Sequence, residues 1–170
     1  MNINYNLTEE DYMHFSLYHA KNSPATRKSL RTQLLIFPFF FLIAAFLYTW
    51  IADQNILWPL VCFSVFSILW LVLYPKYFYS FVKRYSKKML DEAGDVGLLG
   101  DHQMNFSEKG IVDSTSSGKT YMEWSTIKNL EENENYFYVY SSPTTAYILP
   151  KRAVTSVEKT RDYIQSRIHM

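Results

Sequence analysis

Two long apolar runs dominate the pattern of hydrophobic and polar positions. One covers residues 34–52, the other covers residues 56–75, and neither contains a charged side chain. An α-helix of about 20 apolar residues is long enough to cross the hydrocarbon core of a bilayer. A soluble chain of 170 residues has no means of covering two helices that are apolar on every face. The pattern therefore predicts two transmembrane helices.

A link of three polar residues, Asp53, Gln54 and Asn55, separates the two runs. Each helix must satisfy its own backbone polar groups within the bilayer, and the link must reach water. So short a link predicts an antiparallel hairpin whose two ends lie on the same side of the membrane. Pro38 and Pro59 fall near the predicted helix starts, where a missing N–H group costs least.

Basic residues lie on both flanks of the predicted hairpin. The flanks, residues 21–33 and 76–90, contain four and five Lys or Arg residues and no acid, whereas the link contains one Asp and no base. The positive-inside rule then predicts that both termini are cytoplasmic. These bases have two possible roles: they only fix the topology, or they also bind anionic lipid. Each base near the membrane surface would contribute about 1 kcal/mol of binding free energy in the second case. Apart from Lys21, the flanking bases are Arg27, Lys28, Arg31, Lys76, Lys83, Arg84, Lys87 and Lys88, and these eight are the membrane-flanking residues of this prediction.

The segments next to the hairpin carry helical patterns. Residues 1–33 are expected to form a short strand at residues 2–6 and an amphipathic helix that begins at Thr8, where acidic residues follow a helix-capping side chain. Residues 76–98 repeat aromatic side chains at helical spacing up to a linker at residues 95–100. This basic segment either continues the second span or lies at the membrane surface.

From residue 101 onward the apolar period changes from 3.6 to 2. Six short runs rich in Tyr, Ile, Val and Phe alternate with turn residues such as Lys109-Gly110 and Ser117-Gly118. A final segment, residues 151–168, has an amphipathic helical pattern and could close one end of a curved sheet. Residues 99–170 are therefore expected to form a cytoplasmic domain, and the fold class is an α+β membrane protein: a two-helix hairpin, then a small meander sheet or partial barrel with a helical cap.

This organisation resembles the YcxB-like family of bacterial membrane proteins over nearly the whole chain. The most specific residues are Glu108–Ile111, Trp124–Ile127 and Leu149–Arg152. The resemblance implies a pleckstrin-homology-like barrel in the C-terminal part and a location in the bacterial inner membrane. It implies no catalytic residue and no cofactor.

The sequence offers little support for catalysis, metal binding or transport. His14 and His19 are five residues apart, which misses the spacing that places two imidazoles on one helical face. His102 and His169 are single and are expected to be exposed, and Cys62 is the only cysteine. The two spans contain no ionisable residue that could form an ion path. A net charge of +1 argues against nucleic acid as a partner.

Lys151 and Arg152, at the expected start of the last helix, are the candidate residues for binding a lipid headgroup or a peptide. Residues 99–170 contain eight Lys or Arg and nine Asp or Glu residues, so this domain has no basic field that would steer it to phosphate. A solvated helix start is the alternative interpretation. Charge reversal at both positions is expected to abolish binding and to leave the fold intact, because acidic residues suit a helix N-terminus.

Two non-enzymatic functions are favoured, and an enzymatic function stays open only because dispersed catalytic residues leave no motif in a single sequence. The first is a membrane-anchored interaction module whose partners are membrane lipids or an unidentified protein. The second is an immunity protein against a membrane-active toxin or bacteriocin, which rests on analogy with small two-span proteins. A homo-oligomer is compatible with both.

Overall fold

The computed structural model of the chain describes residues 1–53, 55–93 and 97–168. The chain divides into two compact units, one formed by Met1–Phe15 and Lys87–Met170 and the other by Ser16–Ser86. Helices α1 (Glu9–Asn22) and α3 (Leu57–Ala93) contribute residues to both units.

The unit Ser16–Ser86 is a helical hairpin. Helix α2 (Pro24–Ala52) contains the first apolar run, and α3 contains the second run together with the basic segment that follows it. The basic segment therefore continues the second predicted span as one helix, with Pro75 inside it. Asp53 ends α2 in a left-handed conformation, and the Asn55 side chain accepts a hydrogen bond from the Leu57 N–H at 2.9 Å. Gln54 lies outside the described residues.

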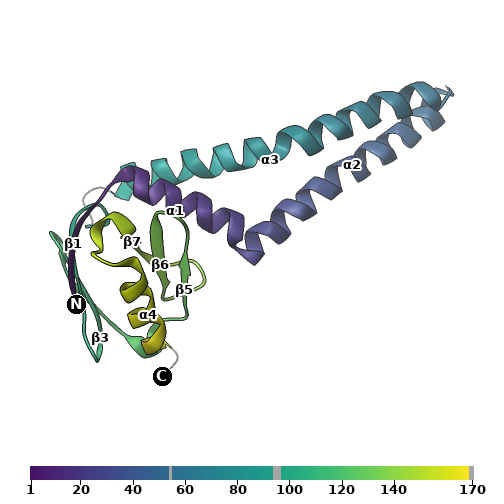
Figure 1. Cartoon of the computed structure of the whole chain (residues 1–170). Coiled ribbons are helices and arrows are strands. Elements are labelled where there is room, and N and C mark those ends of the chain that lie inside the picture. The colour runs from purple at the N-terminus through teal and green to yellow at the C-terminus, as the bar shows by residue number, and fades with distance from the viewer. Residues whose placement is uncertain (54, 94–96, 169–170) are drawn as a thin grey trace. The chain divides into compact units, whose positions relative to one another are not determined.

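Helices α2 and α3 run antiparallel in the hairpin (Figure 1), and aromatic side chains pack between them. The rings of Phe37 and Trp70 are 4.4 Å apart, and Phe41 lies 6.3 Å from Phe63. Nearer the open end of the hairpin, the Tyr74 hydroxyl donates a hydrogen bond to the Gln33 side chain. Partners thus move back along α3 as they move forward along α2, which confirms the predicted hairpin as a helix pair.

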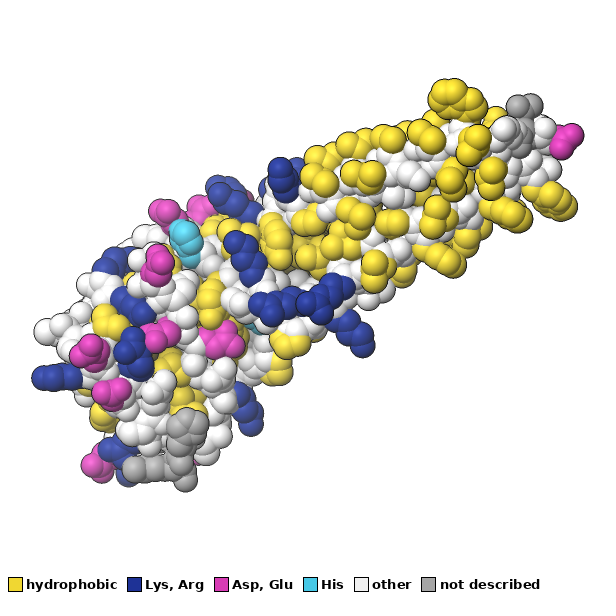
Figure 2. Space-filling model, turned by 45° about the vertical axis from the view of Figure 1, so that its right-hand side comes forward, with side chains coloured by type: hydrophobic (Ala, Val, Ile, Leu, Met, Phe, Trp, Pro, Cys, Tyr) yellow, Lys and Arg dark blue, Asp and Glu magenta, His cyan; other side chains and the backbone are white. Residues whose placement is uncertain are grey.

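Most apolar side chains of the hairpin point away from it. In the most apolar 18-residue window of each helix, 6% of the residues are buried. Figure 2 shows these side chains spread over the surface of the hairpin. Both helices are long and apolar enough to cross a membrane by length and composition. A core helix of a soluble protein would be mostly covered, so this exposure argues against that alternative.

The other unit contains two antiparallel meander sheets, a C-terminal helix and the first part of α1 (Figure 1). The first sheet has the order β1-β2-β3-β4 and the second has the order β5-β6-β7. The strands of the first sheet are β1 (Asn2–Leu7), β2 (Gly100–Phe106), β3 (Gly110–Thr115) and β4 (Gly118–Glu123). Those of the second are β5 (Asn129–Glu132), β6 (Tyr136–Tyr140) and β7 (Ala146–Pro150). The single-turn helices η1 (Trp124–Thr126) and η2 (Lys151–Ala153) follow β4 and β7.

Strand β1 makes the N-terminus part of this folded unit. It pairs with β2 along its whole length, from Asn2 opposite Asn105 to Leu7 opposite Gly100. The amino group of Met1 also donates a hydrogen bond to the Phe106 carbonyl oxygen at 2.8 Å. The compact unit is therefore larger than the domain expected at residues 99–170, because it includes Met1–Phe15 and begins again at Lys87.

The core of this unit comes from the inward positions of the first sheet and from the whole of β6. Ile3, Met104, Phe106 and Ile111 are buried on the first sheet, and all five residues of β6 are buried. Helix α1 lies against the second sheet, where the Phe15 ring is 5.4 Å from that of Tyr138. An α+β architecture follows, as the change of apolar period predicted.

Helix α4 (Val157–Ile168) packs at the end of the unit where η1 lies. The Tyr163 ring meets Phe106 and Trp124 edge-on, at 6.4 and 6.1 Å. The helix begins six residues later than the predicted start at Lys151, because η2 and a short extended segment come first. The predicted linker at residues 95–100 falls partly on residues 94–96, which lie outside the described residues, as does His169.

Candidate functional site

The most unusual polar group in the strand unit is a buried histidine–aspartate pair on the first sheet. His102 on β2 and Asp113 on β3 occupy inward positions, next to the inward residues Met104 and Ile111. The His102 Nδ1 atom lies 3.0 and 3.2 Å from the two carboxylate oxygens of Asp113. The Nε2 atom lies 3.3 Å from the Leu98 carbonyl oxygen. The prediction that His102 is exposed is therefore wrong, since 7% of its surface is accessible.

Geometry and charge both favour the protonated form of His102. Both ring nitrogens face oxygen acceptors, and only imidazolium donates from both nitrogens at once. Burial alone lowers the pKa of His102, but the hydrogen bond and charge of Asp113 outweigh burial and raise the pKa above its ordinary value. The pair is thus an internally neutralised ion pair inside the protein.

Two tyrosine side chains, Tyr5 and Tyr147, lie near this ion pair. Tyr5 on β1, which pairs with His102 in the sheet, stacks on the imidazole with ring centroids 5.2 Å apart. Tyr147 comes from β7 in the other sheet. Burial raises the pKa of both phenols, and the carboxylate of Asp113 raises both further. Both tyrosines therefore remain neutral hydrogen-bonding groups at ordinary pH.

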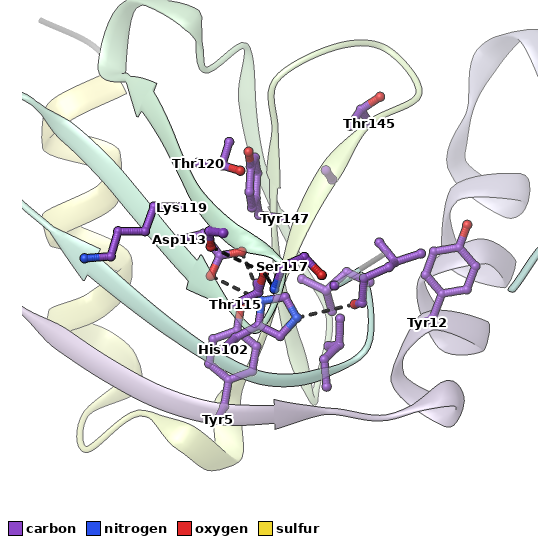
Figure 3. A pocket seen from close by; sticks show the side chains of 16 residues that line it. Tyr5, Tyr12, His102, Asp113, Thr115, Ser117, Lys119, Thr120, Thr145 and Tyr147 are labelled. Atoms are coloured by element: carbon purple, nitrogen blue, oxygen red, sulfur yellow. Dashed lines mark hydrogen bonds and ion pairs between the residues drawn. The ribbon is translucent and has the colours of Figure 1, made fainter. Parts of the chain in front are cut away.

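A pocket of about 620 Å³ opens beside the pair, between the two sheets (Figure 3). Tyr5, His102 and Asp113 line it from the first sheet, and Tyr147 and Ile148 line it from β7. Its volume falls within the range of about 300 to 1,000 Å³ that is usual for small-molecule sites. The hydroxyl-bearing residues around it are Tyr5, Tyr12, Thr115, Ser117, Thr120, Thr145 and Tyr147.

The Gly97 backbone closes one side of this pocket. Gly97 has a positive φ of 70°, and a Cβ built on it would lie 2.5 Å from the Ser117 hydroxyl oxygen. The close approach brings the chain that follows α3 against the β3–β4 turn. A side chain at this position would have to displace Ser117 and adopt a strained backbone conformation.

The predicted binding residue Arg152 has an internal partner. Its guanidinium donates hydrogen bonds of 2.8 and 2.6 Å to the two carboxylate oxygens of Asp11 on α1. Asp11 is 2% exposed and also accepts hydrogen bonds from Tyr136 and Thr8. Burial alone raises the pKa of Asp11, but the Arg152, Thr8 and Tyr136 hydrogen bonds hold it well below its ordinary range. Burial and the bond to Asp11 raise the pKa of Tyr136 to about 12.

Lys151 is held in a second ion-pair network. Its ammonium group lies 2.9 Å from a Glu132 carboxylate oxygen and donates a hydrogen bond of 2.6 Å to the Asn133 carbonyl oxygen. Glu132 also pairs with Arg161 of α4 at 2.7 Å. The hydrogen bond from Arg161 is the largest cause of the lowered pKa of Glu132. This network joins α4 to the second sheet.

These contacts argue against the expectation that charge reversal at Lys151 and Arg152 leaves the fold intact. Glutamate at position 151 would face the Glu132 carboxylate, and glutamate at position 152 would face the Asp11 carboxylate. In each case a repulsion would replace an ion pair. Neither residue begins α4, so the helix-dipole argument does not apply to them. A binding defect in such a variant would not separate lost contact from lost structure.

The flanking bases differ in their surroundings. Arg27 donates a hydrogen bond of 2.5 Å to the Lys21 carbonyl oxygen, near the end of α1. Lys87 pairs with Glu9 at 2.9 Å and Lys88 pairs with Glu92 at 3.5 Å. The remaining bases, all exposed, are Lys28, Arg31, Lys76, Lys83 and Arg84.

The described residues contain no group of three or more His, Cys, Asp or Glu side chains that could hold a metal ion. His14 lies 3.7 Å from Glu10 on the surface of α1, and Cys62 is exposed on α3. The pocket pair itself offers one imidazole and one carboxylate, which already neutralise each other.

Sequence reasoning missed Tyr5, His102, Asp113 and Tyr147 as pocket residues. A signal was present, because strict alternation from Phe106 through Met104 places His102 on the inward face of its strand. A polar residue at an inward position requires a partner, which directs attention to an acid on a neighbouring strand. Which acid pairs with it follows from the register of β2 and β3.

The comparisons with known proteins give a family over part of the chain. The model of a family described as YcxB-like protein matches residues 106–164. This match includes all three of the sequence segments that carried the resemblance, so the family resemblance is confirmed over residues 106–164. No curated protein and no solved structure matches the chain.

Proposed function

We propose that this YcxB-like chain is a non-enzymatic, membrane-anchored binding protein that presents its strand unit at the cytoplasmic face of the bacterial inner membrane. The observation that carries the proposal is the exposed apolar surface of the helical hairpin. Leu35, Phe39 and Phe46 on α2 and Val65, Ile68 and Val72 on α3 are among its exposed side chains. A surface this apolar needs a lipid or protein cover, and its length matches a bilayer.

Charge placement supports the proposed orientation. On α2 the bases occupy the first turns, before residue 34, and on α3 they follow residue 75. Because the helices are antiparallel, both sets lie at the open end of the hairpin, while Asp53 and Asn55 lie at its closed end. The positive-inside rule then favours a cytoplasmic open end.

The sheet topology supports a pleckstrin-homology-like strand unit. Four antiparallel strands followed by three, with a C-terminal helix at one end, agree with the barrel that the family resemblance implies. In such an arrangement the helix closes one end and leaves the other end free for a ligand. The pocket beside His102 and Asp113 lies away from Tyr163 and α4, along the inward positions of β2.

The test is reporter topology and membrane extraction of the full chain. A reporter fused at the N-terminus or at Met170 should lie in the cytoplasm, and a reporter inserted after Gln54 should lie outside. The chain should also stay with the membrane in alkaline carbonate. Release by carbonate, or an external C-terminus, would overturn the proposal.

A matched variant tests the reason for the orientation. Replacing Arg27, Lys28 and Arg31 with Gln and placing Lys at Asp53 and Asn55 should shift a large fraction of the molecules to the inverted topology. Replacing the same number of bases on the surface of the strand unit, at Lys109, Lys128 and Lys159, should leave the topology unchanged. Equal behaviour of the two variants would show that the flanking bases do not set the orientation.

A further inference from the structure

The pocket between the two sheets has a combination of features that restricts its ligand. Its lining holds one buried ion pair, several hydroxyl groups and apolar walls. We propose that it binds an uncharged, hydroxyl-bearing ring, namely a sugar or cyclic polyol, either free or as the headgroup of a glycolipid. This inference rests on the proposed binding function, for which it names the class of ligand. It does not depend on insertion of the hairpin into a membrane.

Charge balance excludes an ionic ligand as the best occupant. The imidazolium of His102 and the carboxylate of Asp113 neutralise each other at 3.0 Å. Lys119 is the other basic residue of the lining, and its side chain points away from the His102–Asp113 pair in Figure 3. An anion would find no unpaired buried cation here, and a cation would meet the imidazolium.

The hydroxyl groups supply neutral hydrogen-bonding capacity. Thr120 of β4, together with Thr145 and Tyr147 from the other side of the pocket, contributes hydroxyl groups to its lining (Figure 3). Thr115 by contrast is already used, because its hydroxyl accepts a hydrogen bond from the Ser117 N–H at 3.3 Å. Asp113 adds acceptor capacity, since a carboxylate has about four lone-pair sites and a single imidazole nitrogen occupies part of them.

The walls of the pocket supply apolar contact. Tyr5 and Tyr147 contribute aromatic rings, and Leu7, Leu98 and Ile148 contribute aliphatic groups. A sugar or cyclic polyol combines C–H faces with hydroxyl edges, so it can fill apolar and polar contacts together. A purely apolar ligand would leave the buried carboxylate and the phenols without additional partners, which costs binding free energy.

The measurement uses the full chain in a detergent without a sugar headgroup, because a glycoside detergent would itself compete for the pocket. Saturation-transfer NMR is recorded with a panel of neutral monosaccharides and myo-inositol, and with inorganic phosphate as the anionic probe. At least one neutral ring should show saturable transfer that a second neutral ring displaces. Saturable binding of phosphate alone, or of no probe, would overturn the inference.

Two isosteric substitutions tie the signal to the pocket. The double variant T120V and Y147F removes two hydroxyls with little change in side-chain shape and should weaken binding about tenfold. The control Y121F removes a hydroxyl from the neighbouring residue of β4, which points to the other face and bonds the Lys109 carbonyl oxygen. Equal affinities of the wild type, the double variant and the control would place any sugar binding elsewhere.

Vesicle flotation separates the two sources of the ligand. The chain is reconstituted without glycolipid, and soluble competitor sugars and glycolipid-containing vesicles are then compared for their ability to displace the bound probe. If vesicles displace the probe at a lower total sugar concentration than the soluble sugar does, the ligand is a glycolipid headgroup. If only the soluble sugar displaces the probe, the ligand is a free sugar or polyol. A chain that binds a neutral ring yet fails the carbonate test would refute membrane anchoring and leave this inference standing.

Discussion

Arg152 reaches across 141 residues of sequence to hold the carboxylate of Asp11 in a two-pronged ion pair. Asp11 is almost fully buried, while Arg152 remains exposed at its outer side. The pair fastens η2, which follows the last strand, to the first turn of α1. The same guanidinium donates a third hydrogen bond to the Asn6 carbonyl oxygen at the end of β1. Arg152 therefore fixes the N-terminal segment onto the C-terminal half of its unit.

Removing one member of this pair should destabilise the strand unit strongly. The variant R152A leaves a buried carboxylate with only neutral donors, which costs about 3 kcal/mol and lowers the Tm by about 10 °C or more. The variant R152K keeps the charge but loses the two-pronged geometry, so its Tm should lie between those of the wild type and R152A. Thermal unfolding of the detergent-solubilised chain measures both.

Two further variants complete this experiment. K159A removes an exposed base of α4 whose side chain forms no hydrogen bond or ion pair with another described residue, and it should leave the Tm unchanged. D11A combined with R152A should cost less than the sum of the single losses, because neither charge is then left alone. Strict additivity would contradict a direct interaction between Asp11 and Arg152.

The His102–Asp113 pair should make stability fall as the pH rises. The pKa of His102 is raised in the folded state, so the folded protein holds this proton more tightly than the unfolded chain. The resulting stabilisation is complete below about pH 6.5, the ordinary pKa of histidine, and is lost as the pH rises through the folded-state pKa. The free energy of unfolding, measured from pH 5 to 9, should therefore decline across this window.

The variants H102Q and D113N test the origin of the decline. H102Q removes the titrating group, and D113N removes the charge that raises its pKa, so both should flatten the profile above pH 6. H14Q, on the exposed side of α1, should retain the wild-type slope. A slope that survives in D113N would mean that another group binds the proton.

The sequence predicted much of the architecture because local patterns determine it. The two apolar runs, the capping position at Thr8 and the alternating strands all appear at or near their expected positions. The capping prediction is confirmed at the atomic level, since the Asp11 N–H donates to the Thr8 hydroxyl and the Thr8 N–H donates to Asp11. Each of these features depends on residues only a few positions apart.

The site was harder to predict because it depends on contacts between distant segments. Tyr5 meets His102 through the pairing of β1 with β2, and Tyr147 joins them from the second sheet. A single sequence contains no signal for that pairing. For the same reason Lys151 and Arg152 looked like free surface cations, although their partners Glu132 and Asp11 lie in two other elements. The helical pattern of residues 151–168 also suggested a helix start at Lys151, where the chain forms only a short turn.

The N-terminal segment should prove necessary for folding of the strand unit. A fragment that begins at Leu99 lacks β1, so it leaves the backbone of β2 unpaired on one side and loses the buried side chains of Ile3, Tyr5 and Leu7. It also leaves Arg152 without Asp11. This fragment should melt without a cooperative transition, in contrast to the expectation from the sequence that residues 99–170 fold alone.

Restoring the segment in a single soluble chain isolates its contribution from that of the hairpin. Joining Phe15 to Lys87 through about ten Gly and Ser residues replaces the hairpin with a flexible linker and keeps every residue of the unit. The Lys87–Glu9 ion pair at 2.9 Å shows that α1 and the last part of α3 approach each other within this unit, so the linker can span the gap. Circular dichroism should then give a cooperative melt. The same chain with I3D, which places a charge at a buried position of β1, should lose it, whereas N4D at the adjacent exposed position should not. A cooperative melt of the Leu99 fragment equal to that of the joined chain would show that β1 is dispensable and that the sheet is held by β2, β3 and β4 alone.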